Sequence, residues 1–482
     1  MVVRILAPVL EILFNRNLNE TFVPAVWKKA LITPLFKKGS KLQKENYRPI
    51  SLTCHLSKIM ERVLKNHIFT YLQTYNKFEQ EQHGFCQGLS TVTNLVEFYD
   101  FVFQQIDTGI PVDVIYYDLS KAFDKVSHQK LKVKLVSEGI TGPIGNWVIE
   151  WLNDRRQSVV LDDQHSEWSL VTSGVPQGSV LAPLLFSLFI KGFAKHDECK
   201  IGKFADDTKT GSPANDVMDH YRIQAGIDEA ANWCAQWQIP INLDKVAVMH
   251  FGNSNAWIQY HIMGRLLKED VETRDLGIII DNNLNFTKHS EQIVKDCNSL
   301  LYLINRTITS RNQRVYLQLY LTLLRPKLEY GVPFWEPLFK KDVLALESIQ
   351  RKVTKKVHGL SSLKYEDRLK LLKLPTLVWR RKRIGLMYMF KVIRQQNIAL
   401  QNSFFELRRD SRPNAMLTRG NDYKLVLSRV HYNAVCNSFR HRLIKLWNSL
   451  PSDIVNANSL FQFKVRLDNY EETKPELVYL LE

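Results

Sequence analysis

The stretch KFADDTKT, residues 203–210, places two acids, Asp206 and Asp207, side by side in a turn. The residues before the pair mix apolar and basic side chains as a short strand does. A second strand is predicted at Val112–Tyr117, the β-branched and aromatic run VDVIYY, which ends at Asp118. If these strands lie in one antiparallel sheet, the three carboxylates meet at one edge of it.

Such a meeting of carboxylates suggests a metal site. Crowded carboxylates repel one another and raise each other's pKa, and a hard divalent cation such as Mg²⁺ relieves the repulsion. Two ions about 3.5–4 Å apart can hold the attacking and leaving oxygens of a phosphoryl transfer. Taken alone, an Asp pair in a turn is more often structural, because Asp favours turns. The order of the surrounding motifs is what favours the metal site.

The composition indicates a folded protein with an anionic partner. The chain has 482 residues, 45% of them hydrophobic, which suggests two to four subdomains. A net charge of +16 favours nucleic acid as the partner, with an anionic membrane surface second. The six cysteines form no CxxC pair, so neither a zinc knuckle nor a disulfide framework is indicated, and a reducing intracellular compartment is expected. No apolar run is long enough to span a bilayer, so no stable membrane association is expected.

Local patterns divide the chain into an α+β part and a helical part. Amphipathic helices are predicted at 61–75, 91–105 and 225–238, a strand at 246–252, and a Gly/Pro loop at 173–179 that opens an apolar helix at 180–190. From about Ser290 only helices are predicted. One of them, at 314–325, has apolar residues at helical spacing, among them Val315, Leu319 and Leu323.

Positive charge is concentrated near the end of the helical part. Residues 351–383 hold twelve Lys or Arg against two acids, Glu366 and Asp367. This density predicts sequence-independent contacts to phosphates. Tyr365 and Trp379 lie within the run and are candidates for stacking on unpaired bases. A solvated helix face with core aromatics is an equally good interpretation.

From about Trp27 to its end, the chain resembles the reverse transcriptases of non-LTR retrotransposons, most of all the jockey-type elements. PLFKKG (34–39) and NYRPISL (46–52) resemble the fingers motifs, and QHGFCQGLST (82–91) the next block. The polymerase motifs follow in order: motif A resembles YYDLSKAFDKV (116–126), motif B SGVPQGSVLAPLLF (173–186) and motif C FADD (204–207). Motif D resembles NLDKVAVMHF (242–251) and motif E RDLGIIIDNNLNF (274–286). Each is a modest signal alone, but eight in order are a strong one.

The resemblance implies a right-hand polymerase of α+β class that extends a primer 3′-OH with dNTPs on an RNA template. The expected regions are an N-terminal extension (1–26), fingers and palm (27–285), a helical thumb (286–345) and a basic C-terminal region (346–482). The implied partners are an RNA template, a DNA primer or target and dNTPs, and the implied location is the nucleus or cytoplasm. The implied cofactor is a pair of Mg²⁺ ions, with Mn²⁺ as a substitute.

The resemblance also assigns roles to single residues. The catalytic set is Asp118 and Asp206 as main metal ligands, Asp207 as the supporting acid, and Lys245 acting on the leaving pyrophosphate. The substrate-binding set is Lys37 or Lys38, Arg48, Phe123, Gln177 and Gly178. The Phe123 ring is expected under the sugar, where it would exclude a ribose 2′-OH. Gly174 and Gly178 are expected to let backbone approach the substrate, and Asp124 to cap or pair structurally.

Several alternatives remain open at this stage. Phe123 could be a core residue, Lys245 a surface lysine, and 173–179 a turn without a ligand. Full-length relatives carry an upstream endonuclease domain, which is not expected here, and FIKGFA (189–194) and Val246 depart from the family pattern. An inactive or domesticated nucleic-acid-binding remnant is therefore the alternative function. A maturase-like splicing cofactor is disfavoured by RPKLEYGVPFWEP (325–337).

Overall fold

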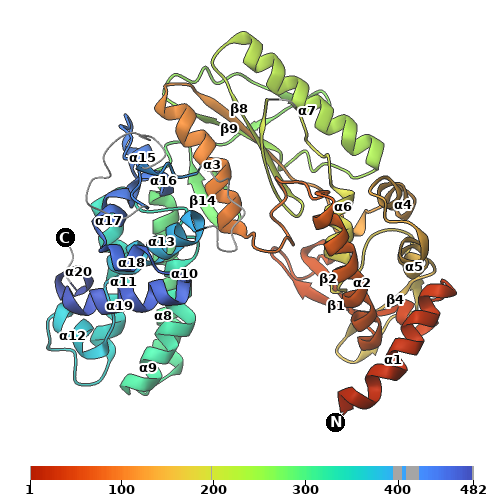
Figure 1. The fold of residues 1–482 in the computed structure, drawn as a ribbon, viewed down its shortest axis with the longest axis horizontal. Helices are drawn as coiled ribbons and strands as arrows, with labels where there is room; N and C mark the ends of the chain where they lie inside the picture. The colour runs from red at the N-terminus through yellow and green to blue at the C-terminus, as the bar shows by residue number, and fades with distance from the viewer. Residues whose placement is uncertain (1, 197, 395–403, 409–422, 480–482) are drawn as a thin grey trace.

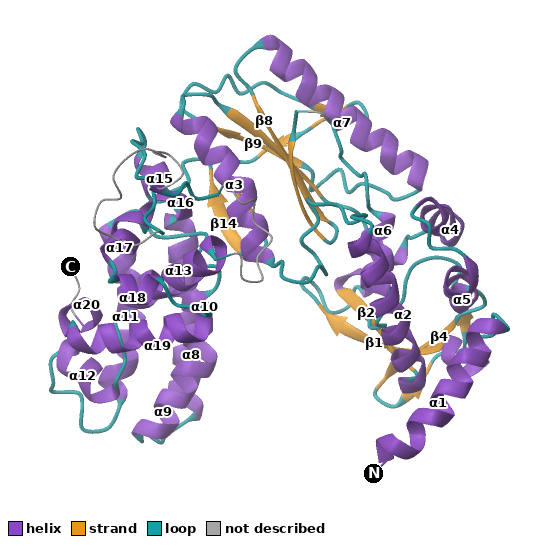
Figure 2. Ribbon diagram, in the orientation of Figure 1, coloured by secondary structure: helices purple, strands orange, loops and turns teal. Residues whose placement is uncertain are grey.

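In the computed structural model, described for residues 2–196, 198–394, 404–408 and 423–479, the chain forms an arch (Figure 1). Strands are concentrated at the top of the arch and in the N-terminal limb, whereas the other limb is almost wholly helical (Figure 2). Within the described residues, no helix combines the length and apolarity needed to cross a membrane.

The sheet at the top of the arch, which we call the palm sheet, has the strand order β12-β9-β3-β8-β7. Its strands are β3 (Val112–Tyr117), β7 (Lys200–Phe204), β8 (Asp207–Pro213), β9 (Ala247–Phe251) and β12 (Lys268–Glu269). The central strand β3 is antiparallel to both β8 and β9, and β7 is antiparallel to β8. The strand that ends before Asp118 and the strand that begins at Asp207 are therefore direct neighbours. β7, the strand predicted before the Asp pair, lies in the same sheet as β3, as expected, but β8 stands between the two.

Alternate side chains of β3 belong to two different cores. Val112 and Val114 are buried with α3 (Thr91–Asp107) in a core that continues into the C-terminal helices. Ile115 and Tyr117 are buried on the other side with residues of α6 (Ala182–Phe189) and α7 (Val217–Trp237). Because both faces are covered, β3 is almost continuously apolar, and its C-terminal end is held rigidly.

The N-terminal limb, expected to be the fingers, is built around a second sheet. Its strands are β1 (Lys29–Phe36), β2 (Tyr47–Thr53), β4 (Arg156–Leu161), β5 (Gln164–His165) and β6 (Ser169–Leu170). Its helices are α1 (Val2–Asn19), α2 (His55–Thr74), α4 (His128–Ser137) and α5 (Gly142–Leu152). β1 pairs antiparallel with β2 and parallel with β4, so the loop 37–46 lies at the tip between β1 and β2.

The C-terminal limb follows two short hairpins, β10 (His261–Ile262) with β11 (Arg265–Leu266), and β13 (Glu272–Asp275) with β14 (Ile278–Asp281). The first six helices of this limb and the long helix near its end are α8 (Thr287–Thr307), α9 (Gln313–Leu319), α10 (Arg325–Glu329), α11 (Lys340–Lys356), α12 (Tyr365–Leu372), α13 (Leu377–Ile393) and α19 (Leu460–Thr473). Shorter ones are α15 (Asn433–Cys436), α16 (Phe439–Arg442), α17 (Ile444–Ser449), α18 (Ser452–Val455) and α20 (Pro475–Tyr479). The predicted boundary at 345/346 falls inside α11, and residues on both sides of it share one core.

One local prediction in this limb is wrong. Val315 and Leu323, proposed as part of an apolar helix face, are each 41% exposed. The buried positions are instead Tyr316, Tyr320 and Leu324. The buried face is offset by one residue from Tyr316 onward, so that two large aromatic side chains and Leu324 enter the core; the π-helical turn at Tyr320–Leu324, between α9 and α10, begins only after this offset.

Candidate active site

The three predicted acids lie at one end of the palm sheet. The register of β3 and β8 ends with Tyr117 opposite Thr208, so its continuation by one residue places Asp118 opposite Asp207. Asp206 lies in the tight turn between β7 and β8, whose flanking pair is Phe204 and Asp207. Antiparallel register thus brings together residues that are almost ninety positions apart in the chain.

The electrostatics of this end confirm that the acids interact. Desolvation raises the pKa of Asp206, and the charge of Asp118 raises it further, while Lys37 and Arg48 oppose the shift. The pKa of Asp207 is raised to about 6, first by desolvation and then by the charges of Asp206, Asp275 and Asp118. A cation bound beside Asp206 and Asp207 would favour the ionised form of both carboxylates.

Asp118 has a cationic partner already in place. The Nζ of Lys245 lies 2.8 Å from Oδ2 of Asp118, and both side chains are partly open to solvent, at 48% and 32%. The segment that carries Lys245 is tied to the segment after β3, because the Asn242 amide donates to the Asp118 carbonyl at 2.8 Å. Lys245 therefore lies at the acidic end of the palm sheet, where its ammonium neutralises one of the carboxylates. Its predicted action on the leaving pyrophosphate stays a prediction.

Carboxylates at this end suit a divalent cation of the hard class. Among the described residues, no three His, Cys, Asp or Glu side chains are gathered closely enough to hold a metal by themselves. Mg²⁺ usually takes one or two protein carboxylates, and substrate phosphates supply further oxygens. The ligand roles of Asp118, Asp206 and Asp207 stay predictions.

Phe123 is placed next to the acids by a short 3₁₀ turn, Ala122–Asp124, after β3. Its ring is half-buried and stacks on Phe186 of α6, with centroids 4.2 Å apart and planes 14° apart. The exposed Phe85 meets its edge at 6.1 Å. Phe186 thus supports one face of the Phe123 ring and limits its movement, while part of the ring stays exposed to solvent.

The loop 173–179 docks against the protein's own backbone. Gln177 donates through Nε2 to Oδ1 of Asp124 at 2.9 Å, which confirms the expected structural pairing of Asp124. A Cβ at Gly174 (φ +89°) would lie 2.8 Å from Cα of Asp124, and one at Gly178 (φ +120°) would lie 2.6 Å from the Ser51 carbonyl oxygen. Both glycines are required for internal packing, so their predicted approach to substrate is a separate question and stays a prediction.

The basic residues of the fingers tip face the acids electrostatically. Lys37, Lys38 and Arg48 are exposed around the β1–β2 hairpin. The charges of Lys37 and Arg48 are among the main influences that lower the pKa of Asp206. Of the two lysines that the sequence left as alternatives, Lys37 is therefore the better candidate for a phosphate contact.

The basic run 351–383 differs from its prediction. Trp379 is 1% exposed and Tyr365 is 7% exposed, so neither ring is available to stack on a base. Arg381 and Arg383 are also buried. The expectation that this whole segment forms a basic surface is wrong for its C-terminal third.

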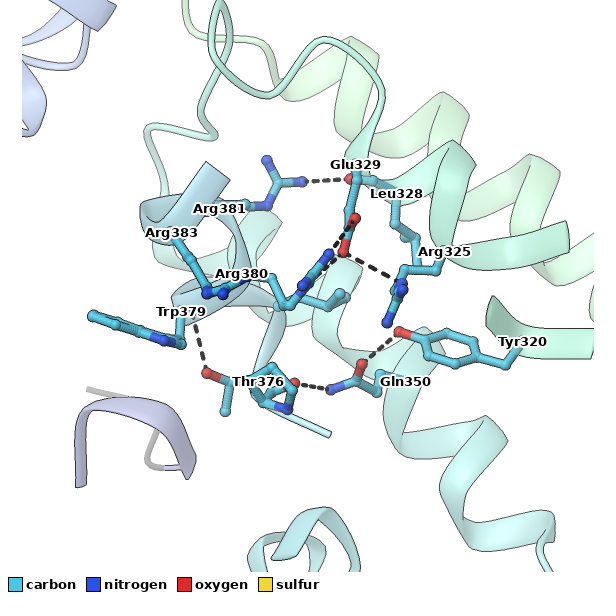
Figure 3. Close-up of polar contacts among 12 residues, drawn as sticks. Tyr320, Arg325, Leu328, Glu329, Gln350, Thr376, Trp379, Arg380, Arg381 and Arg383 are labelled. Atoms are coloured by element: carbon cyan, nitrogen blue, oxygen red, sulfur yellow. Dashed lines mark hydrogen bonds and ion pairs between the residues drawn. The ribbon is translucent and has the colours of Figure 1, made fainter. Parts of the chain in front are cut away.

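The arginines of α13 contact groups from other helices, and Figure 3 shows Arg380 with Glu329 and Arg381 with Leu328. Arg380 donates to both carboxylate oxygens of Glu329 at 2.7 and 2.8 Å. Arg381 donates to the Leu328 carbonyl, and Arg383 pairs with Asp468 and, at 2.8 Å, with Glu471. These acids lie 51 to 88 residues away in the chain, so no local pattern could reveal the pairing.

Two functional neighbours escaped the sequence prediction. Lys209 is 3% exposed and pairs with the buried Asp275 of β13, which also accepts a hydrogen bond from Tyr99 at 3.1 Å. This pair ties β8 to the hairpin of motif E. The sequence of β8, DTKTGSP, has no apolar alternation that could have marked Lys209 as internal. Gln82, the other residue, contacts the turn that carries Asp206.

Comparison with known proteins finds relatives among transposon polymerases. A probable RNA-directed DNA polymerase from transposon BS of Drosophila melanogaster is 28% identical over 367 residues, 72% of this chain and 40% of the relative. The RNA-directed DNA polymerase from the mobile element jockey of the same species is 27% identical over 365 residues, 73% of this chain and 40% of the relative. The chain thus spans about 40% of the length of these relatives.

Solved structures include an apo telomerase from Candida tropicalis that aligns with a TM-score of 0.42 and 10% identity, over 78% of this chain and 68% of that one. Residues 36–292 match the family model described as reverse transcriptase (RNA-dependent DNA polymerase). The matched segment includes Asp118, Asp206, Asp207 and Lys245 and covers more than half of the chain. The chain therefore belongs to the reverse transcriptase family.

Proposed function

We propose that this chain is an RNA-directed DNA polymerase that extends a primer 3′-OH with dNTPs on an RNA template, as part of a non-LTR retroelement. The observation that carries the proposal is the meeting of Asp118, Asp206 and Asp207, with Lys245 paired to Asp118, at the end of the palm sheet. The names of the transposon relatives support the same chemistry.

The acids would hold the metal. Members of the family depend on divalent cations, and we propose two Mg²⁺ ions, or Mn²⁺ in their place, bound mainly by Asp118 and Asp206. When bound, such ions lower the pKa of the attacking 3′-OH and balance the charge of the phosphates. The crowding that raises the pKa of Asp207 and Asp206 would be relieved in the same step.

The neighbouring side chains would position and discriminate the substrate. Arg48 and Lys37, exposed near the acids, would hold the triphosphate by charge-assisted hydrogen bonds. The supported ring of Phe123 would lie under the sugar and exclude a 2′-OH. Lys245 would leave Asp118 when cations neutralise that carboxylate, and its ammonium would then donate a proton to the leaving pyrophosphate.

The test is primer extension with purified protein on an RNA template, comparing the wild type with Asp206→Asn. Extension should be lost in Asp206→Asn, whereas primer–template affinity should stay within about threefold, because basic residues supply most of that affinity. Asp228→Asn, on the exposed side of α7, is the matched control and should extend normally. A wild-type chain that binds primer–template but never extends it would instead support the inactive remnant. Normal extension by Asp206→Asn would remove Asp206 from the metal site.

A further inference from the structure

The turn that carries Asp206 is held from behind by one side chain, Gln82. Gln82 is 3% exposed and lies in QHGFCQGLST, between α2 and α3. Its Oε1 accepts a hydrogen bond from the Ala205 amide at 2.9 Å, and its Nε2 donates to the Ala205 carbonyl at 3.2 Å. Both backbone polar groups of the residue before Asp206 are therefore satisfied by a residue 123 positions away.

The amide of Gln82 can be oriented in only one way. Its Oε1 also accepts from the Gly84 amide at 2.7 Å, so two N–H donors point at this atom and one carbonyl at the other. A flipped amide would set donor against donor at both N–H groups. Among the uncharged side chains of this length, only glutamine supplies both an acceptor and a donor at these places.

Backbone contacts hold the Gln82 segment against β7. The His83 amide donates to the Lys203 carbonyl at 2.9 Å, and the Lys203 amide donates to the Glu81 carbonyl at 3.0 Å. A Cβ at Gly84 would lie 2.3 Å from the Ala205 nitrogen, so the close approach requires glycine at this position. The segment therefore cannot move away from the turn without breaking several backbone hydrogen bonds.

The turn itself needs such support. Ala205 has φ +58°, the left-handed region that a residue with a Cβ rarely adopts. The conformation of Ala205 sets the direction in which the Asp206 side chain leaves the chain. A backbone held in a disfavoured conformation persists only where its surroundings determine it, and here Gln82 provides both side-chain bonds.

We propose that Gln82 is a positioning residue for the metal site: its amide fixes the left-handed conformation of Ala205 and thereby holds the Asp206 carboxylate where a divalent cation binds. The inference rests on the proposed function only for the use of that cation in catalysis. The conformational part of it holds for the metal-free protein. Residues that orient metal ligands in this way typically contribute about 10- to 100-fold to metal affinity or activity.

The first measurement uses metal-free protein and does not depend on activity. Gln82→Met keeps the side-chain volume and removes all three hydrogen bonds, so hydrogen exchange at the Ala205 and Gly84 amides should be at least about 10-fold faster. The matched control is Asn94→Leu. Asn94 is as buried as Gln82 and donates through Nδ2 to the Lys203 carbonyl at 3.0 Å. Lys203 lies on β7, two residues before Ala205, so the lost hydrogen bond does not involve Ala205 itself. Exchange at Ala205 should stay at the wild-type rate in the control.

The second measurement follows Mn²⁺ binding by electron paramagnetic resonance and the Mg²⁺ dependence of primer extension. Gln82→Met should weaken Mn²⁺ binding and raise the half-saturating Mg²⁺ concentration by about 10-fold. At saturating Mg²⁺, kcat should recover to within about threefold of the wild type, with the KM for dNTP little changed. A loss that comes only from misfolding would not be rescued by metal, and Asn94→Leu should show no shift in metal dependence.

If Gln82→Met does not fold, Gln82→Glu is the second variant, because an ionised carboxylate still accepts from Ala205 and Gly84 but cannot donate to the Ala205 carbonyl. It should keep the Ala205 amide protected and still raise the half-saturating Mg²⁺ concentration. Unchanged exchange at Ala205 in Gln82→Met, or the same metal dependence as Asn94→Leu, would overturn the inference. The two parts can be told apart. If the wild type extends no primer but hydrogen exchange at Ala205 responds to Gln82→Met as predicted, the proposed function fails and the positioning of Ala205 by Gln82 still holds.

Discussion

Phe123 illustrates how a single side chain can be both packed and exposed. The stack on Phe186 accounts for one face of the ring, and Phe186 is itself completely buried. The interpretation of Phe123 as a core residue is thus correct for the face that stacks on Phe186, while its predicted role under the sugar stays a prediction. Steric exclusion needs this arrangement, because a ring can exclude a hydroxyl group only if it cannot move away.

Replacing Phe123 with Ala should admit ribonucleotides. Removal of the ring opens space for one hydroxyl group, so the preference for a dNTP over its rNTP, measured as the ratio of kcat/KM values, should fall by about 10-fold or more. The stability should also fall, by about 1–3 kcal/mol, because half of the ring is packed. Phe189→Leu is the control. Phe189 is buried on α6, as is Phe186, but its ring contacts Trp237. An unchanged ratio in Phe123→Ala would make Phe123 a core residue only.

At the scale of the secondary-structure elements, α13 is fixed by its arginines. Arg380 and Glu329 form a two-pronged pair with side chains that are 18% and 16% exposed, and Arg325 approaches the same carboxylate at 3.7 Å (Figure 3). A partly buried pair of this geometry stabilises more than a surface pair does. Breaking it leaves a desolvated charge without its partner.

Arg380→Gln should therefore destabilise the protein by about 1–3 kcal/mol, measured by urea or thermal unfolding. The double-mutant cycle with Glu329→Gln should give a coupling energy above about 0.5 kcal/mol, because the two groups contact directly. Lys373→Gln, at an exposed position of the same basic run, is the control and should change the stability by less than about 0.5 kcal/mol. An Arg380→Gln protein as stable as this control would contradict the internal role of Arg380.

Another element-scale prediction concerns His289 of α8. The side chain is 4% exposed, its ring meets Trp335 edge to face at 4.5 Å, and its Nδ1 accepts from the Ile279 amide at 3.3 Å. Desolvation, with smaller effects of Arg381 and Arg274, lowers the pKa of His289 to about 3. The imidazole is therefore neutral in the folded protein, and α8 and β14 are joined by a histidine that cannot charge without unfolding.

The sign of the pH dependence follows from proton uptake. Between about pH 6.5 and 3 the unfolded histidine binds a proton that the folded one does not, so stability falls as the pH falls through this range. The limiting slope for one group is about 1.4 kcal/mol per pH unit. Unfolding measured from pH 7.5 to 5 should show a shallower acid loss in His289→Gln than in the wild type. His358→Gln, at an exposed histidine, should keep the wild-type slope. Identical slopes for all three proteins would contradict the buried neutral histidine.

At the scale of the whole molecule, two cores support the arch. One holds the fingers, α6 and α7, and the other joins α3 and one face of the palm sheet to the C-terminal helices as far as α19. The palm sheet belongs to both, because alternate residues of β3 enter different cores. A continuous core across the thumb and the C-terminal region makes them one structural unit, so the basic run within it divides into a buried part and an exposed part.

That division predicts where salt-dependent affinity comes from. Four exposed lysines of the run are to be replaced together by Gln: Lys355, Lys356, Lys370 and Lys373. If all four contact phosphate, the slope of the logarithm of the primer–template binding constant against the logarithm of the salt concentration should flatten by up to roughly 3–4 units. The nucleotide-addition rate at saturating primer–template should barely change. Arg380→Gln is the contrast within the run, since its charge is already paired inside the protein. An unchanged slope in the lysine variant would make this face a solvated one with no role in binding.

The sequence alone determined the elements around the active site and the order in which they occur. β3 occupies the predicted residues, Val112–Tyr117, and the helix predicted at 91–105 is α3, Thr91–Asp107. These predictions succeed because strand and helix periods, turn residues and the eight motifs are local properties of the chain. Acids at strand ends can be placed at one sheet edge as soon as the strands are known to pair.

Only the tertiary structure decided which polar side chains are internal. For the basic run two interpretations were equally open, and the structure agrees with core aromatics for Trp379 and Tyr365, while it also buries Arg381 and Arg383, which neither interpretation predicted. Gln82 and Lys209 had no predicted role. Their partners, such as Glu329 for Arg380 and Ala205 for Gln82, lie tens to more than a hundred residues away. A buried charge or amide is tolerated only where such a partner satisfies it, and the chain fold alone brings the two together. Local periodicity carries no information about that meeting.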